Sequence, residues 1–184
     1  MKLALDAMGG DFAPHAVVQG ALDAIDKSSN PLSLILLGDE TAIRTEMAGR
    51  EVETIEIVHT DEVVNMDDKG SKVLKMKPNS SLVRGIQMVK DGQADGFISA
   101  GHTGAVLSTT LLSLGRIPGV RRPALAAYFP TEKRGKVLCD VGANPDAKPE
   151  HLVQFALMAS HYYDHVEGFA APKIGLINIG VEPN

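Results

Sequence analysis

The chain has 184 residues, 44% of them apolar, which is enough to bury one hydrophobic core, so we expect a single globular domain over residues 1–184. Its 18 Lys and Arg against 23 Asp and Glu give a formal net charge of −5, and no segment gathers a basic stripe. This charge pattern disfavours a nucleic-acid-binding protein. The single cysteine, Cys139, excludes an intrachain disulfide and a Cys-rich zinc site.

Neither the first residues nor the longest uncharged segment of the chain indicates a secreted or membrane protein. The first residues lack the apolar core of a signal peptide. The longest uncharged run, residues 96–115, is rich in Gly, Ser and Thr and makes a poor membrane span. We therefore predict a cytoplasmic protein.

Short apolar runs alternate with helical patterns along the whole chain, which is typical of βα units around a mostly parallel sheet. The predicted strands are 3–5, 34–37, 54–58, 96–98, 125–129, 137–139 and 174–177. The predicted helices are 15–28, 40–48, 80–91, 104–115 and 150–166. The polar segment 59–79 between them has no strong period, and we interpret it as a partly helical active-site or interface loop. The predicted fold class is α/β, a three-layer α/β/α sandwich.

The end of the chain predicts an incomplete site. Residues 174–179 have the pattern of a buried strand that runs into a glycine turn, and no helical pattern follows to cover it. Ligands of open α/β sheets bind at the carboxyl ends of strands, where this chain stops. Either a partner chain completes the fold or the chain is the N-terminal part of a longer catalytic chain.

Two predicted strands end in glycine-rich loops that suit anion binding. Asp6 closes the first strand, and Gly9, Gly10 and Asp11 follow it, so backbone amides can approach an anion between two carboxylates. A tight βα turn explains the same residues without a ligand. The second loop, 99–104, lies between a strand and a helix, where free amides favour phosphate. It lacks the Walker lysine and the G-x-G-x-x-G spacing, so neither ATP nor a dinucleotide is indicated, and its glycines also suit helix packing.

A third loop, 140–151, follows the strand at 137–139 and concentrates polar side chains before a helix. Asn144, Lys148 and His151 are its candidate functional residues, although helix capping by Asp146 explains part of the pattern. Because parallel strands end at one edge of a sheet, we expect all three loops to converge there. His161 and His165 have metal-ligand spacing, but the end of a helix is an ordinary place for histidines, so no metal site is predicted.

Together these motifs resemble the bacterial phosphate acyltransferase family of phospholipid synthesis. The stretches that carry the resemblance are DAMGGDFAP (6–14), SAGHTGA (99–105), GRIPGVRRPALA (115–126), DVGANPDAKPEHLVQFALM (140–158) and GLINIGVE (175–182). Members of this family are longer than this chain, and they usually have Asn at the position of His102.

The resemblance implies an enzyme that forms acyl phosphate from a fatty acyl thioester of acyl carrier protein and inorganic phosphate. It also implies a fold like that of isocitrate and isopropylmalate dehydrogenases, a homodimer, no cofactor, and peripheral membrane contacts only through segments beyond this chain. Direct attack by phosphate needs no protein nucleophile, in agreement with the lack of a Ser-His or Cys-His pattern. The predicted catalytic residues are Asp6, Asp11, Lys148 and His151. The predicted phosphate- and substrate-binding residues are Gly9, Gly10, Ser99, Gly101, His102, Thr103, Gly104, Asn144 and Asn178.

Two other functions remain open at this point. The chain is either an inactive half that serves as an interaction module, or an enzyme of a related class. The related classes are a phosphate acetyltransferase that uses acyl-coenzyme A and a nicotinamide-dependent dehydrogenase, the latter without the usual glycine fingerprint.

Overall fold

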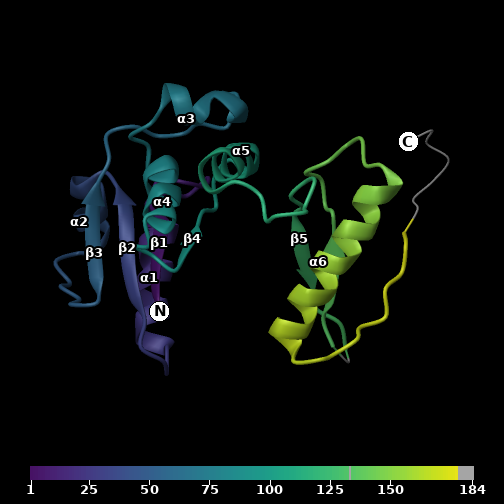
Figure 1. The fold of residues 1–184 in the computed structure, drawn as a ribbon. Coiled ribbons are helices and arrows are strands. Elements are labelled where there is room, and N and C mark those ends of the chain that lie inside the picture. Colours follow the sequence, from purple (N-terminus) through teal and green to yellow (C-terminus); the bar gives the residue numbers. More distant parts are fainter. Residues whose placement is uncertain (133, 178–184) are drawn as a thin grey trace. The chain divides into compact units, whose positions relative to one another are not determined.

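The computed structural model describes residues 1–132 and 134–177, and the chain divides into two compact units, Met1–Gly115 and Arg116–Asn184 (Figure 1). Each unit has a sheet of its own. One α/β domain over residues 1–184 stays a prediction.

The first unit is built on a parallel sheet of four strands in the order β3-β2-β1-β4. The strands are β1 (Lys2–Asp6), β2 (Ser33–Gly38), β3 (Ile55–His59) and β4 (Gly96–Ile98). In register, Ala4 of β1 lies between Ile35 of β2 and Phe97 of β4. All four strands therefore end at one edge, and the loops after β1 and β4 are neighbours there.

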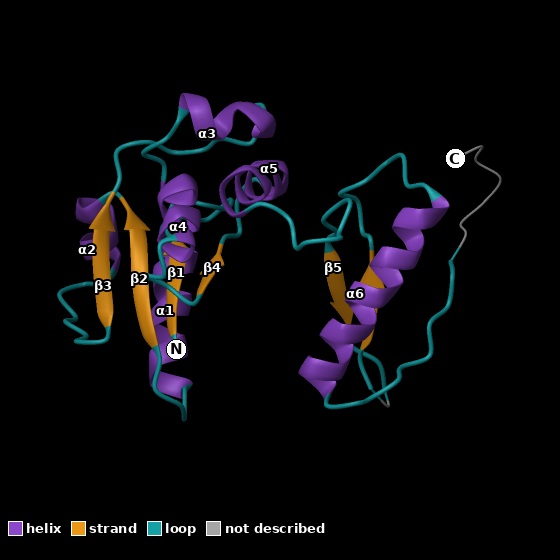
Figure 2. Ribbon diagram, viewed as in Figure 1, coloured by secondary structure: helices purple, strands orange, loops and turns teal. Residues whose placement is uncertain are grey.

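Helices cover both faces of this sheet, because alternate residues of each strand point to opposite sides. Leu5, Leu34 and Leu36 face α1 (His15–Lys27) and α2 (Glu40–Glu46). Ala4, Ile35 and Leu37 face the other side, where α4 (Ser81–Lys90) contributes Met88 and Val89. Figure 2 shows α4 in front of the strands, with α1 and α2 behind. The predicted three-layer α/β/α arrangement is confirmed in this unit.

Polar caps fix where two of these helices begin. Asp39 directly follows β2, and its carboxylate accepts a hydrogen bond from the Ala42 N–H at 2.8 Å. The Ser80 hydroxyl, which is fully buried, accepts one from the Val83 N–H at 3.4 Å. Such caps satisfy the free amides of a first helical turn.

The polar segment 59–79 is partly helical, as predicted. It contains a single 3-10 turn, η1 (Gly70–Lys72), followed by α3 (Val73–Met76). Val73 is 2% exposed and packs in one cluster with residues of α4 and of α5 (Thr103–Leu114). The segment is therefore attached to the helices of this unit by an apolar contact rather than projecting freely from it.

The second unit pairs a two-stranded sheet with one long helix. Strands β5 (Ala126–Phe129) and β6 (Lys136–Cys139) are antiparallel, and α6 (Pro149–Glu167) packs on β6. Phe155 of α6 is 1% exposed. The hydroxyl of Tyr163, also on α6, donates to the carbonyl of Gly135 at 3.1 Å, just before β6 begins.

Two predictions about strands are wrong. Residues 174–177 form no strand, and their side chains Ile174 and Leu176 are 61% and 81% exposed. A strand needs a neighbour to satisfy its backbone groups, and within residues 1–132 and 134–177 nothing pairs with this segment. Moreover, β6 belongs to a separate antiparallel sheet, so of the three predicted loops only those after β1 and β4 lie at one sheet edge.

None of the helices in the described residues is both long enough and apolar enough to cross a membrane.

Candidate functional site

The two glycine-rich loops of the first unit meet at the carboxyl edge of the parallel sheet. Because β1 and β4 are adjacent, the loop after Asp6 lies against the loop after Ile98. A Cβ atom at Gly9 would lie 3.0 Å from the Gly101 nitrogen and 2.4 Å from the nearer Asp6 carboxylate oxygen. Only a glycine permits this approach of the two backbones, so the sequence pattern DAMGGD has a packing reason at its first glycine.

The carboxylate of Asp6 connects these loops. Asp6 is 3% exposed, and its Oδ2 accepts a hydrogen bond from the Ser99 hydroxyl at 2.7 Å. Its Oδ1 accepts one from the Ser81 hydroxyl at 2.5 Å and one from the Met8 N–H at 3.2 Å. The Ser99 hydroxyl also accepts from the Gly101 N–H at 3.1 Å, so the second loop is held through the same group.

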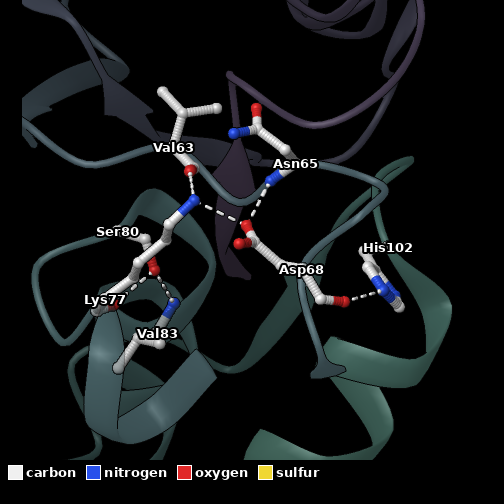
Figure 3. Close-up of polar contacts among 7 residues, drawn as sticks. All are labelled: Val63, Asn65, Asp68, Lys77, Ser80, Val83 and His102. Carbon is white, nitrogen blue, oxygen red and sulfur yellow. Dashed lines mark hydrogen bonds and ion pairs between the residues drawn. The ribbon is translucent and has the colours of Figure 1, made fainter. Parts of the chain in front are cut away.

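His102 begins α5 as its cap. Its Nδ1 accepts a hydrogen bond from the Ala105 N–H at 3.2 Å. Its Nε2–H donates to the Asp68 carbonyl at 2.9 Å, as Figure 3 shows. These partners require the tautomer that carries the proton on Nε2. Thr103 and Gly104 form the first turn of α5, and the free amides and dipole at the start of a helix favour an anion.

An ion pair holds the segment that carries Asp68. The Lys77 ammonium lies 2.5 Å from Asp68 Oδ2 and donates to the Val63 carbonyl at 2.8 Å, and both charged side chains are about three-quarters buried (Figure 3). The hydrogen bond from Lys77 and the one from the Asn65 N–H together hold the pKa of Asp68 below its usual value, against a smaller opposing effect of burial.

The same segment rests directly on the start of α5. A Cβ atom at Gly70 would lie 2.6 Å from the Gly104 carbonyl carbon and 2.7 Å from the Ala105 nitrogen. Together with the His102 contact, this close approach places residues 62–77 next to the first turn of α5. We call residues 62–77 the strap.

In the second unit, Asp140 organises the third predicted loop. Its carboxylate accepts hydrogen bonds from the N–H groups of Leu125 at 2.8 Å, Ala143 at 3.2 Å and Asn144 at 2.8 Å, and from the Asn144 side chain at 3.0 Å. Burial by itself would raise the pKa of Asp140, but these donors outweigh it and lower that pKa. Burial, and to a smaller extent the charge of Asp140, raises the pKa of the neighbouring Cys139 thiol, which disfavours the reactive thiolate.

Two further predicted residues shape the start of α6. Lys148 is the exposed residue at its N-cap, and its N–H donates to Nδ1 of His151 at 3.1 Å. The His151 side chain is 7% exposed, and its ring lies 6.3 Å from that of Phe155. His151 therefore caps and packs the helix, whereas Lys148 leaves its charge in solvent.

The structure thus brings together Asp6, Gly9, Ser99, Gly101, His102, Thr103 and Gly104, with Gly10 and Asp11 exposed in the same first loop. Asn144, Lys148 and His151 lie in the second unit, and Asn178 lies outside the described residues. In the described parts of the chain, no group of three or more His, Cys, Asp or Glu side chains is placed to hold a metal ion.

The sequence analysis missed Ser81, Gly70, Asp68 and Lys77. Ser81 lies at the start of the predicted helix 80–91, but no local pattern indicates its hydrogen bond to a residue 75 positions earlier. No spacing rule links Asp68 to Lys77 in a segment without a regular period.

The comparison with protein families decides the chain's membership. A family model described as "Fatty acid synthesis protein" matches residues 1–184. The chain belongs to this family. Among curated relatives it is 46% identical to "Phosphate acyltransferase" of Desulfitobacterium hafniense (strain Y51), over 99% of this chain and 54% of the relative. It is also 46% identical to the protein of that name from Listeria innocua serovar 6a, over 99% of this chain and 53% of the relative. The chain spans about half the length of the curated relatives it matches.

Two solved structures share the fold. One is "EutD phosphotransacetylase from Staphylococcus aureus", with a TM-score of 0.63 and 19% identity over 91% of this chain and 54% of that one. The other is a branched-chain phosphotransacylase from Enterococcus faecalis V583, with a TM-score of 0.54 and 16% identity over 88% of this chain and 50% of that one. The likeness supports the α/β fold class, whereas the expected resemblance to isocitrate and isopropylmalate dehydrogenases stays a prediction.

Proposed function

We propose that this chain is part of an acyltransferase that forms acyl phosphate from a fatty acyl thioester of acyl carrier protein and inorganic phosphate, in phospholipid synthesis. The observation that carries the proposal is the meeting of two glycine-rich loops beside the first turn of α5, in a chain whose relatives are named phosphate acyltransferase. The proposed protein is cytoplasmic and homodimeric.

The reaction requires that phosphate be held and aimed rather than that a side chain attack. A phosphate oxygen forms a bond to the thioester carbonyl carbon, and the tetrahedral intermediate then expels the thiolate as the C–S bond breaks. The thiolate takes up a proton to leave as a thiol. Amides at the start of α5 suit this task, since they bind an anion without the reorganisation that water would need.

Side chains in this proposal act on charge and protons. Asp11 is exposed in the first loop and is the carboxylate there that is accessible to a reacting group. Lys148, exposed at the start of α6, is the proposed cation for phosphate. The side-chain N–H groups of Asn144 donate hydrogen bonds to the Asp140 carboxylate and the Pro123 carbonyl. Its proposed contact with substrate would therefore use its side-chain oxygen.

A second candidate is phosphotransacylation with acyl-coenzyme A in place of the carrier protein, which the names of the two solved structures favour. Acyl phosphate formation from each thioester, trapped with hydroxylamine, distinguishes the two substrates. The assay compares this chain with a relative of full length. Activity with acyl carrier protein supports our proposal, preference for acyl-coenzyme A supports the second candidate, and no product from either thioester in the full-length relative refutes both.

Lys148→Ala in the full-length protein tests the proposed cation. We expect acyl phosphate formation to fall at least tenfold while the thermal midpoint stays unchanged, because an exposed lysine contributes little to the core. Equal turnover in variant and wild type would remove Lys148 from the site.

A further inference from the structure

The carboxylate of Asp6 is buried and accepts several hydrogen bonds, whereas the other carboxylate of the first loop, Asp11, is exposed. Three donors reach it, the hydroxyls of Ser81 and Ser99 and the N–H of Met8, and the residue is 3% exposed. Asp11, five residues later, is exposed to solvent. A carboxylate whose lone pairs already accept hydrogen bonds inside the protein is poorly placed to take a proton from a substrate.

The donors to Asp6 come from three different parts of the first unit. Ser81 is the first residue of α4 and is 1% exposed, whereas Ser99 directly follows β4. Asp6 itself ends β1. One buried side chain therefore connects the ends of two neighbouring strands and the start of a helix.

The link continues from Asp6 into the second glycine-rich loop. The Ser99 hydroxyl donates a hydrogen bond to Asp6 and accepts one from the Gly101 N–H. Asp6 is therefore linked through Ser99 to the backbone at Gly101. Gly9 closes the arrangement from the other side, since a Cβ there would displace Asp6 Oδ2. His102, Thr103 and Gly104 follow Gly101 without a break.

We infer that Asp6 is a positioning residue, not a catalytic one, and that through Ser81 and Ser99 it fixes the glycine-rich loop 99–104 against the loop after β1. This inference deepens the proposed function, because the loop that Asp6 fixes is the one proposed to bind phosphate. It also reassigns Asp6, which the sequence placed among the catalytic candidates.

The experiment uses this chain, labelled with ¹⁵N, and measures hydrogen exchange at the Gly101 amide. Ser99→Ala removes the acceptor of that amide, and Ser81→Ala removes one donor from Asp6. We expect exchange at Gly101 to become about tenfold faster in Ser99→Ala and several-fold faster in Ser81→Ala, as loss of a hydrogen bond to a charged network implies. Ser99→Thr keeps the hydroxyl and is expected to retain slow exchange.

Ser33→Ala is the matched control, because it removes a hydroxyl at the opposite end of the sheet, where β2 begins. A general loss of stability would speed exchange across all strands, whereas the proposed role predicts a change confined to residues 6–10 and 99–104. Unchanged exchange at Gly101 in both Ser81→Ala and Ser99→Ala would overturn the inference, as would an equal effect of Ser33→Ala.

A titration of the same samples with inorganic phosphate separates this inference from the proposed function. If phosphate shifts the amides of the loop 99–104 in the wild type, we expect several-fold weaker binding in Ser81→Ala, whose buried hydroxyl contacts Asp6, and no change in Ser33→Ala. Phosphate affinity that stays the same in Ser81→Ala would refute positioning of the binding loop. If the wild-type amides do not respond, the proposed phosphate site fails in this chain, and exchange at Gly101 alone decides the role of Asp6.

Discussion

Replacement of Gly70 by alanine tests how the strap packs on α5. The added Cβ would lie 2.6 Å from the Gly104 carbonyl carbon, 2.7 Å from the Ala105 nitrogen and 2.8 Å from the Gly104 oxygen. Ordinary van der Waals contact begins near 3.4 Å, so the two backbones must move apart by several tenths of an ångström. All three atoms are backbone atoms of a helical turn, so no flexible side chain can move aside.

The expected cost is about 1–3 kcal/mol, the usual range for an added methyl group in a tightly packed site. Gly20→Ala provides a control with the opposite sign. Gly20 lies within α1, and a Cβ there would meet nothing within 4 Å. Alanine in a helix is favoured over glycine by about 0.5–1 kcal/mol, so this variant should be more stable than the wild type.

The assay is urea unfolding followed by circular dichroism at 222 nm, with amide NMR spectra of both variants. We expect the free energy of unfolding to fall in Gly70→Ala and to rise in Gly20→Ala, and the amides of residues 102–105 to shift only in the former. A Gly70→Ala protein as stable as the wild type, with unshifted amides at 102–105, would show that the strap does not rest on α5.

Three further outcomes are expected. The lowered pKa of Asp68 means that its pairing with Lys77 stabilises the fold fully above about pH 4 and is lost as the pH falls through the lower pKa of the folded state. The stability difference between wild type and Lys77→Met should therefore narrow between pH 6 and pH 3, and a constant difference would contradict this. Tyr163→Phe should cost about 1 kcal/mol in urea unfolding, because it leaves the Gly135 carbonyl without its donor. His151→Ala should cost about 1 kcal/mol or more, with partial recovery in His151→Gln, since a glutamine at the third helical position can also accept from the N–H of the N-cap residue; equal stability of all three proteins would refute a capping role.

The sequence by itself predicted most of the strands and helices of the first unit and the glycine-rich loops between them. Period and turn residues predicted β1 to β4 and the helices between them, because alternating burial on a sheet and one apolar stripe on a helix are local patterns. The DAMGGD and SAGHTG stretches were placed at strand ends for the same reason. Where a strand depends on a distant partner, local pattern was insufficient: 174–177 has the composition of a strand, but no described residue pairs with it.

Only the tertiary structure showed which contacts the candidate site residues make. The sequence does not distinguish Asp6 from Asp11, since both are carboxylates beside the same glycines. In the structure Asp6 is buried and accepts hydrogen bonds from Ser81, Ser99 and Met8, whereas Asp11 is exposed. His151 was predicted as a catalytic residue, and the structure shows that its Nδ1 accepts a hydrogen bond from the Lys148 N–H at the start of its own helix. The hydrogen bonds of Asp6 join residues 75 and 93 positions apart, and that of His151 depends on the orientation of its ring. Hydrogen bonds of this kind depend on how helices and strands pack together, which local sequence patterns do not show.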